Sequence, residues 1–359
     1  MGLVVTVQHI VNVNILKVWK NVLVKHWTNI VREVFPRAEV LDAALAYPIT
    51  DFGWDVNVPS STEFCNFEDP QYRLVINLQD MLTRYEDHKV PGELTKLHQH
   101  FLKNNFPMEK IIVIIWPLGI KKDWPKDSFH LIEFSSHQYE TWCQYKQAED
   151  VLREAFSVEH KDFEFNFVCP NRIYKPHRAA LTGKLDSRIG NISLQTKGME
   201  LKYPNLSVEE YDKQYDNLVN LLAMRKNYNT ALFTIISESQ YSEQYGIITE
   251  KTFNAIVAGH PFLLCAHQYA LENIRHYGFQ TYNYLFDEAY DDLDNVVRIK
   301  DMLDSNYHFV HEKLSSVELW KIFEDLQGLI TYNRDYFFDQ FGPLLIDELR
   351  MDLLDLWAR

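Results

Sequence analysis

Four short runs of Val, Ile, Leu and Phe constrain the fold of this chain more than any other feature of its sequence. They read LVINL at 74–78, IIVII at 111–115, LFTII at 232–236 and FLLC at 262–265. Such runs are typical of strands that are covered on both faces in a parallel sheet. Segments with the period of amphipathic helices lie between them, notably 139–156 and 208–225. This alternation of strands and helices predicts doubly wound α/β layers.

The length of the chain predicts two lobes. Its 359 residues exceed the roughly 250–300 at which one hydrophobic core stops growing. No Gly/Ser linker interrupts the sequence, so we place the boundary in the short polar stretch near 160, where a helical period ends. We therefore expect an N-terminal lobe over 1–160, a C-terminal lobe over 161–335 and a C-terminal helix over 336–359 that braces the lobes.

The net charge, the cysteines and the lengths of the apolar runs indicate which partners and which compartment to expect for this chain. The net charge of −14 disfavours a surface that holds a nucleic acid backbone, although a local basic groove for DNA stays possible. The four cysteines are far apart and lack CxxC spacing, which favours a reduced, cytoplasmic chain. No apolar run approaches the about 18 residues that a spanning helix needs, so we expect no membrane span.

The segment 237–264, SESQYSEQYGIITEKTFNAIVAGHPFLL, is the most informative one. It starts as a polar loop after a predicted strand, and Thr249 is a good N-cap for a helix that Gly259 ends. A helix N-terminus at the carboxyl end of a strand suits a pyrophosphate. Lys251 would add a positive charge there, and Glu238 and Glu250 would accept hydrogen bonds from hydroxyl groups. The alternative is that Thr249 and Glu250 only begin a capped helix.

A second candidate anion site is NRIYKPHR at 171–178, which follows the predicted strand over 163–169. Residues 171–202 hold seven Lys or Arg and two acids, a net charge of +5 inside an acidic chain. A phosphate site and a solvated helix face explain this surplus equally well.

Residues 238–261 resemble the donor-binding signature of the α1,3-fucosyltransferase family. They are still more similar to fucosyltransferase-like glycosyltransferases of bacteriophages and environmental bacteria, whose sequences contain TEKTFKPIAxGHPF and a basic loop NRxxRPHR. Three residues depart from the family: Ser239 stands where it has Asn, and Gly246 and Ile247 replace an aromatic-acidic pair. The matching residues are Asn171, Arg172, Pro176, His177, Arg178, Glu238, Ile248, Thr249, Glu250, Lys251, Asn254, Ala255, Gly259 and Pro261.

This resemblance implies a GT-B architecture, with two Rossmann-like lobes facing a cleft, and a glycosyltransferase that uses a nucleotide-sugar donor, GDP-fucose-like, and no obligatory metal. It places the donor site in the C-terminal lobe. The enzyme would act in the cytoplasm of a bacterium or of a phage-infected host. Arg172 and Arg178 would then neutralise the diphosphate with help from Lys251, and truncating Arg178 would leave folding almost unaffected. Glu238 and Glu250 would hold sugar or ribose hydroxyls. Asn171, His177 and Thr249 belong to the same motifs.

An inverting transferase also needs a carboxylate near the acceptor hydroxyl as general base. Asp80 has the best position, just after the predicted strand over 74–78. The acidic run 287–294, DEAYDDLD, is a weak candidate for a metal site and is more typical of a solvated loop. We expect the acceptor to be a glycan or another hydroxyl compound. Two alternatives stay open: a phage glycosyltransferase that modifies hydroxymethylated DNA bases, and a non-catalytic glycan-binding or structural module.

Overall fold

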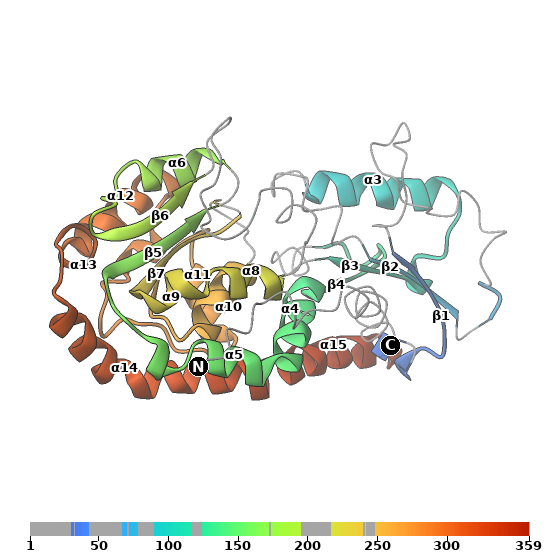
Figure 1. Ribbon diagram of the computed structural model, residues 1–359. Helices are drawn as coiled ribbons and strands as arrows, with labels where there is room; N and C mark the ends of the chain where they lie inside the picture. Colours follow the sequence, from blue (N-terminus) through green and yellow to red (C-terminus); the bar gives the residue numbers. More distant parts are fainter. Residues whose placement is uncertain are drawn as a thin grey trace. The chain divides into compact units, whose positions relative to one another are not determined.

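The chain is an α/β protein with two parallel sheets, each in a compact unit of its own (Figure 1). The first unit comprises 1–136 and 344–359, and the second comprises 137–343. The predicted α/β class is confirmed at this level. The computed structural model describes residues 30–31, 33–42, 67–69, 72–77, 90–115, 124–171, 174–194, 217–239, 241 and 248–358.

The sheet of the first unit has the order β1-β2-β3-β4, with all neighbours parallel. Its strands are β1 (Arg37–Asp42), β2 (Tyr72–Asn77), β3 (Ile111–Ile115) and β4 (His130–Glu133). Helix α3 (Val90–Lys103) and the 3-10 turn η5 (Met108–Lys110) precede β3. Every residue of β3 is buried, as its continuous apolar run predicts. The described strands follow one another across this sheet, so its order does not reverse within them.

The sheet of the second unit has the order β6-β5-β7-β8 and is also parallel. Its strands are β5 (Phe165–Asn171), β6 (Gly190–Leu194), β7 (Ala231–Ser237) and β8 (Phe262–Cys265). The strand that follows β5, β6, lies next to it toward one edge of the sheet, whereas β8, the strand that follows β7, lies toward the opposite edge. The strand order therefore reverses between β5 and β7, and ligands of open α/β sheets bind outside the carboxyl ends of strands at such a point.

The helices of the second unit follow the same alternation. The helix α10 (Glu250–Val257) connects β7 to β8 and packs on β7, and α6 (Pro176–Thr182) connects β5 to β6. The others are α4 (Ser136–Gln147), α5 (Glu149–Ala155), η7 (Val158–His160), α8 (Asn217–Ala223), α9 (Arg225–Asn229), α11 (Ala270–His276), η8 (Ala289–Asp292), α12 (Asn295–Ser305), α13 (Tyr307–His311) and α14 (Ser316–Tyr336). None of the helices in the described ranges combines the length and the apolar character needed to cross a membrane.

The C-terminal segment is helical throughout, as its period predicts. A capping box of Ser315 and Glu318 starts α14, which continues through the π-helical turn η9 (Phe337–Phe341) into α15 (Gly342–Trp357). Leu345, Leu349 and Leu353 of α15 recur every four residues and are buried. This apolar face explains how α15 joins the hydrophobic core of the first unit.

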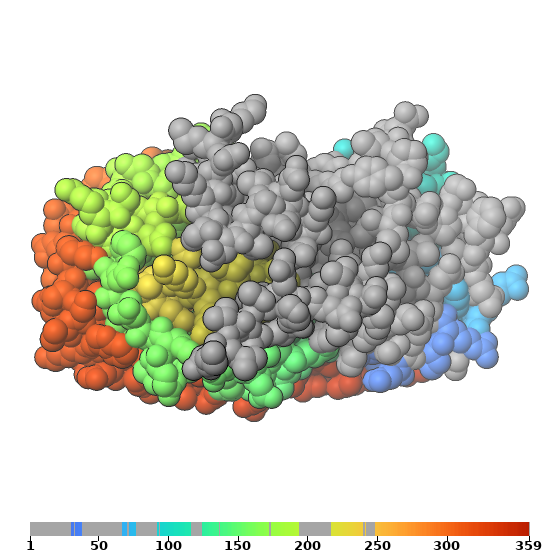
Figure 2. Space-filling model, viewed as in Figure 1, coloured from blue at the N-terminus to red at the C-terminus, as the bar shows by residue number. Residues whose placement is uncertain are grey.

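The boundary between the compact units lies at 136/137 and not near 160. Helix α5 lies alongside α14 (Figures 1 and 2), and Arg153 donates to Asp335 at 2.8 Å. In α4 the Tyr145 hydroxyl donates to Asn254 of α10. The helical period of 139–156 predicted an amphipathic segment, but not which sheet its apolar face covers.

Several elements differ from the sequence-based expectation. The single helix predicted over 139–156 divides at Ala148 into α4 and α5. The strands β1, β4 and β6 had no predicted counterpart, because they are short and interrupted by charged or polar residues. Alternating apolar residues at 5–15 indicate a further strand, and the helical period over 16–34 indicates a helix, but 5–15 and most of 16–34 lie outside the described residues.

The buried side chain of Lys161 is expected to make the free energy of unfolding depend on pH. It is buried after η7 and donates to the carbonyl of Ala258 at 3.0 Å, at the end of α10. Burial, with the charge of Arg334 as a second cause, lowers the pKa of Lys161 to about 7. An unfolded lysine has a pKa of about 10.4. Between these values the unfolded chain binds more protons, so the free energy of unfolding rises with pH through this window.

We expect Lys161→Met to remove this rise. One proton contributes at most about 1.4 kcal/mol per pH unit to the free energy of unfolding. Urea unfolding of the parent and the variant at pH 7, 8, 9 and 10 measures the difference. Parallel pH profiles would show that the buried amine does not lose its proton in the folded state.

Candidate functional site

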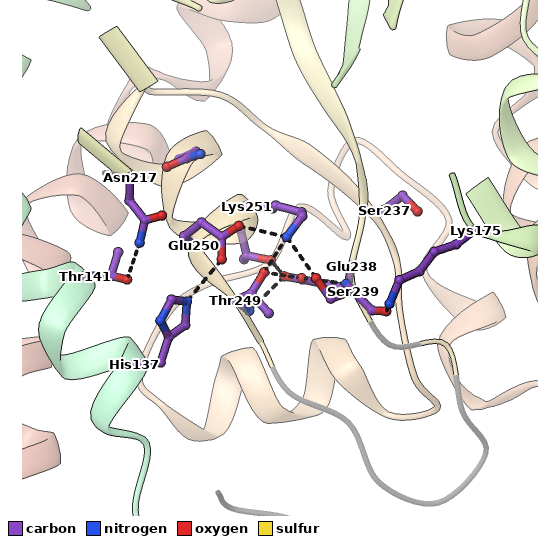
Figure 3. Close-up of polar contacts among 12 residues, drawn as sticks. His137, Thr141, Lys175, Asn217, Ser237, Glu238, Ser239, Thr249, Glu250 and Lys251 are labelled. Atoms are coloured by element: carbon purple, nitrogen blue, oxygen red, sulfur yellow. Dashed lines mark hydrogen bonds and ion pairs between the residues drawn. The ribbon is translucent and has the colours of Figure 1, made fainter. Parts of the chain in front are cut away.

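The candidate site lies where the strand order of the second unit reverses. Strand β5 ends at Asn171 and β7 ends at Ser237, and the next helices along the chain are α6 and α10. Figure 3 shows polar side chains from these two connections and from α4 meeting near the first turn of α10. The motifs at 171–178 and 238–251, which are separate in the sequence, thus meet at one edge of the sheet.

Glu238, the first residue after β7, is an internal anchor for α10. Its side chain is fully buried. One carboxylate oxygen accepts from the backbone N–H of Thr249 at 3.0 Å and from the hydroxyl of Thr252 at 2.7 Å. The other accepts from the hydroxyl of Thr249. The resemblance implies contact with sugar hydroxyls, but in this geometry Glu238 fixes the position of the helix start.

Thr249 is the N-cap residue of α10, as predicted, with extended backbone angles. Its hydroxyl donates to Glu238 and accepts from Lys251, so it does not cap the first turn. Unsatisfied backbone N–H groups at the start of a helix, together with the helix dipole, attract anions. The first turn of α10 therefore has no side-chain cap at Thr249, although the N–H of Thr252 donates to the carbonyl of Thr249 at 3.2 Å.

Lys251 lies beside that helix start. Its ammonium group donates to Glu250 at 2.8 Å and to the hydroxyls of Ser239 and Thr249 at 3.1 Å each (Figure 3). The side chain is 23% exposed, so it can reach a bound ligand. Lys175, in the connection before α6, donates to the carbonyl of Ser239 and brings a second positive charge to the same loop.

Glu250 is held from two sides. One carboxylate oxygen accepts from Lys251, and the other lies 3.1 Å from Nε2 of His137. Burial alone would raise the pKa of Glu250, but Lys251 and His137 outweigh it and hold the pKa well below its usual range. The carboxylate is therefore ionised at neutral pH. A quarter of its side chain is exposed, which lets it accept hydrogen bonds from a ligand.

Arg178 and His177 of α6 support the residues that follow β7. Arg178 is buried and donates to the carbonyls of Ser237 and Glu238 at 3.4 and 3.2 Å. Its burial lowers the pKa, while the carboxylates of Glu238 and Glu250 act in the opposite direction. Nε2 of His177 lies 3.1 Å from the carbonyl of Glu238, and its ring stacks on Tyr241 with centroids 5.2 Å apart. Burial lowers the pKa of His177 to about 4, so this ring is neutral at physiological pH.

Of the remaining predicted site residues, Asn171 is described by the structure and the other two are not. Asn171 is buried at the end of β5, where its backbone N–H donates to Ser193 and its side chain donates to Cys169 at 3.2 Å. Arg172 and Asp80 lie outside the described residues. Hydrogen bonds therefore join most described members of the predicted donor set at one place, while Asn171 contacts Ser193 and Cys169 instead, and the predicted general base stays a prediction. The joined members are His177, Arg178, Glu238, Thr249, Glu250 and Lys251.

Sequence reasoning missed His137. It is the second residue of α4 and is separated from its partner Glu250 by 113 positions, and nothing in the sequence around it marks a site. The sequence marked Lys175 and Ser239 only weakly. Lys175 belongs to the basic motif at 171–178, and Ser239 stands where the family pattern has Asn.

The acidic run 287–294 has a structural role. Asp291 is buried and accepts from the backbone N–H of Leu271 at 3.0 Å, near the start of α11. Glu288 accepts from the backbone N–H of Tyr282 at 2.8 Å and from Arg275 at 3.0 Å. Within the described ranges, no group of three His, Cys, Asp or Glu residues is placed to hold a metal ion.

The side chains of the site indicate which chemical groups it can bind. Comparisons of the chain with models of protein families, with curated proteins and with solved structures give no match. The start of α10 and Lys251 suit an anionic group such as a diphosphate. The ionised, partly exposed Glu250 suits a donor of hydrogen bonds such as a sugar hydroxyl. A nucleotide, or a nucleotide sugar, carries both kinds of group.

Proposed function

We propose that this chain is a glycosyltransferase that moves a sugar from a nucleotide-sugar donor, GDP-fucose-like, to a hydroxyl acceptor without a metal ion. One observation carries the proposal: the residues that resemble the fucosyltransferase donor motifs meet where the strand order reverses between β5 and β7. Both motifs follow the carboxyl ends of neighbouring parallel strands, which is where ligands of open α/β sheets bind. We also propose that the two α/β units are the Rossmann-like lobes of a GT-B architecture.

The roles of the residues follow from their exposure. The start of α10 and Lys251 would bind the diphosphate and stabilise the negative charge that develops as the nucleoside diphosphate leaves, which requires no proton transfer. Glu250 would accept hydrogen bonds from ribose or sugar hydroxyls. Glu238 and Arg178, which are buried, would hold the two connections in place. Asp80 remains the proposed general base.

A thermal-shift screen with GDP, UDP, CMP and their sugars tests this proposal. A ligand that binds the folded state alone raises its stability by about 2.7 kcal/mol at one hundred times its dissociation constant. We expect GDP and GDP-fucose to raise the melting temperature most. No shift with any nucleotide would contradict the proposal, and glycan binding without nucleotide binding would favour a glycan-binding module instead.

We expect donor binding to persist in EDTA, because Lys251 and the start of α10 provide the positive charge that a metal ion would otherwise supply. Isothermal titration calorimetry with GDP, in EDTA and in Mg²⁺ or Mn²⁺, measures the dissociation constant in each. Binding that occurs only with the divalent ion would overturn the metal-independent part of the proposal.

A further inference from the structure

His137 approaches the site from a different helix than the other residues. It lies at the start of α4, and its Nε2 faces the Glu250 oxygen that Lys251 does not contact. A carboxylate oxygen can only accept hydrogen bonds, so Nε2 must carry a proton. Glu250 is thus held between an imidazole N–H and an ammonium group (Figure 3).

The charges around His137 determine its protonation. Glu250 and Lys251 of α10 and Glu140 of its own helix act on it. Burial lowers the pKa of His137, but the hydrogen bond and charge of Glu250, with the charge of Glu140, outweigh burial and the opposing Lys251, and the net pKa is raised above 6.5. The surroundings of His137 therefore favour the protonated ring, which carries a positive charge.

We propose that His137 is a positioning residue of the donor site: its Nε2–H holds the Glu250 carboxylate beside Lys251, and its protonation adds a positive charge next to the bound donor. This inference rests on the proposed function and names a pH dependence of the same site. A nucleotide sugar carries a diphosphate that stays ionised throughout the neutral range. The protonated site should bind it more tightly, so affinity should fall as pH rises.

The pairing itself is measured without any nucleotide. Labelling the histidine Cε1 carbons with ¹³C gives an NMR signal for each ring, and the signal lost in His137→Gln identifies His137. We expect its pKa to fall by about one unit or more in Glu250→Gln, since a charge at hydrogen-bond distance favours the protonated ring. An unchanged pKa would overturn the inference.

The effect on the donor is measured by calorimetry with GDP-fucose from pH 6 to pH 9. Each unit by which the ligand raises the pKa of the ring corresponds to about tenfold in affinity. We expect the affinity of the parent to fall by about three- to tenfold over this range. In His137→Gln, whose amide can donate to Glu250 but cannot be protonated, affinity should match the parent at high pH and show no such fall. His137→Ala should bind more weakly at every pH.

His308→Gln is the matched control. His308 also pairs with a glutamate, Glu312, at 2.7 Å, but both side chains are exposed on the surface. Its variant should keep the pH profile of the parent. If GDP-fucose and the other nucleotide sugars all fail to bind, the proposed function fails and this inference with it. If GDP-fucose binds with the same pH profile in the parent and in His137→Gln, only this inference fails.

Discussion

Replacement of Arg178 by Leu is expected to destabilise the folded chain by about 3–5 kcal/mol, because removing one member of a buried set of opposite charges leaves the other uncompensated. Arg178 is 2% exposed and Glu238 is fully buried. The substitution also removes the donor from two backbone carbonyls at the end of β7. Urea unfolding measures the loss as a lower midpoint. Because Arg178 is buried, we expect this loss in place of the almost unaffected folding that the sequence alone predicts.

Arg188→Leu is the control for this prediction. Arg188 lies in the connection between α6 and β6, pairs with Asp186 and is 88% exposed. Exposed ion pairs contribute about 0–1 kcal/mol, so this variant should unfold almost like the parent. The double variant Arg178→Leu/Glu238→Gln should lose less than the sum of the single losses, because both residues belong to one buried set. Equal stability of Arg178→Leu and Arg188→Leu would show that the buried guanidinium contributes nothing.

Lys251→Ala is expected to weaken donor binding by about 10- to 150-fold. A hydrogen bond to a charged group contributes about 1.5–3 kcal/mol, which corresponds to this range. The reason is structural, since Lys251 adds a full positive charge where the start of α10 already attracts an anion. Calorimetry with GDP-fucose measures the dissociation constant.

Lys300→Ala is the control for Lys251→Ala, because Lys300 is 70% exposed and pairs with Asp304 one helical turn away. It should bind the donor as the parent does. Lys251→Arg, which keeps the charge, should retain more affinity than Lys251→Ala. If Lys251→Ala binds every nucleotide like Lys300→Ala, the ammonium group does not contact the donor, and the proposed site loses its main cation.

The sequence by itself determined the elements whose signals are local. The apolar runs at 111–115 and 262–265 coincide with β3 and β8, and the run at 232–236 lies within β7. Thr249 is the N-cap of α10 and Ala258 is its C-cap, just before Gly259, which has a positive φ of 67°. Each of these features depends on neighbours within a few residues, so the order of residues alone is sufficient to place it.

The tertiary structure alone decided what each of these residues contacts. It placed β5 beside β7, and this pairing brought two separate motifs to one edge of the sheet. It buried Arg178 and Glu238, for which the sequence alone predicts direct contact with the donor. It also brought His137 to Glu250. Burial and charge pairing depend on how distant segments pack, and residues that meet through packing carry no shared signal along the chain.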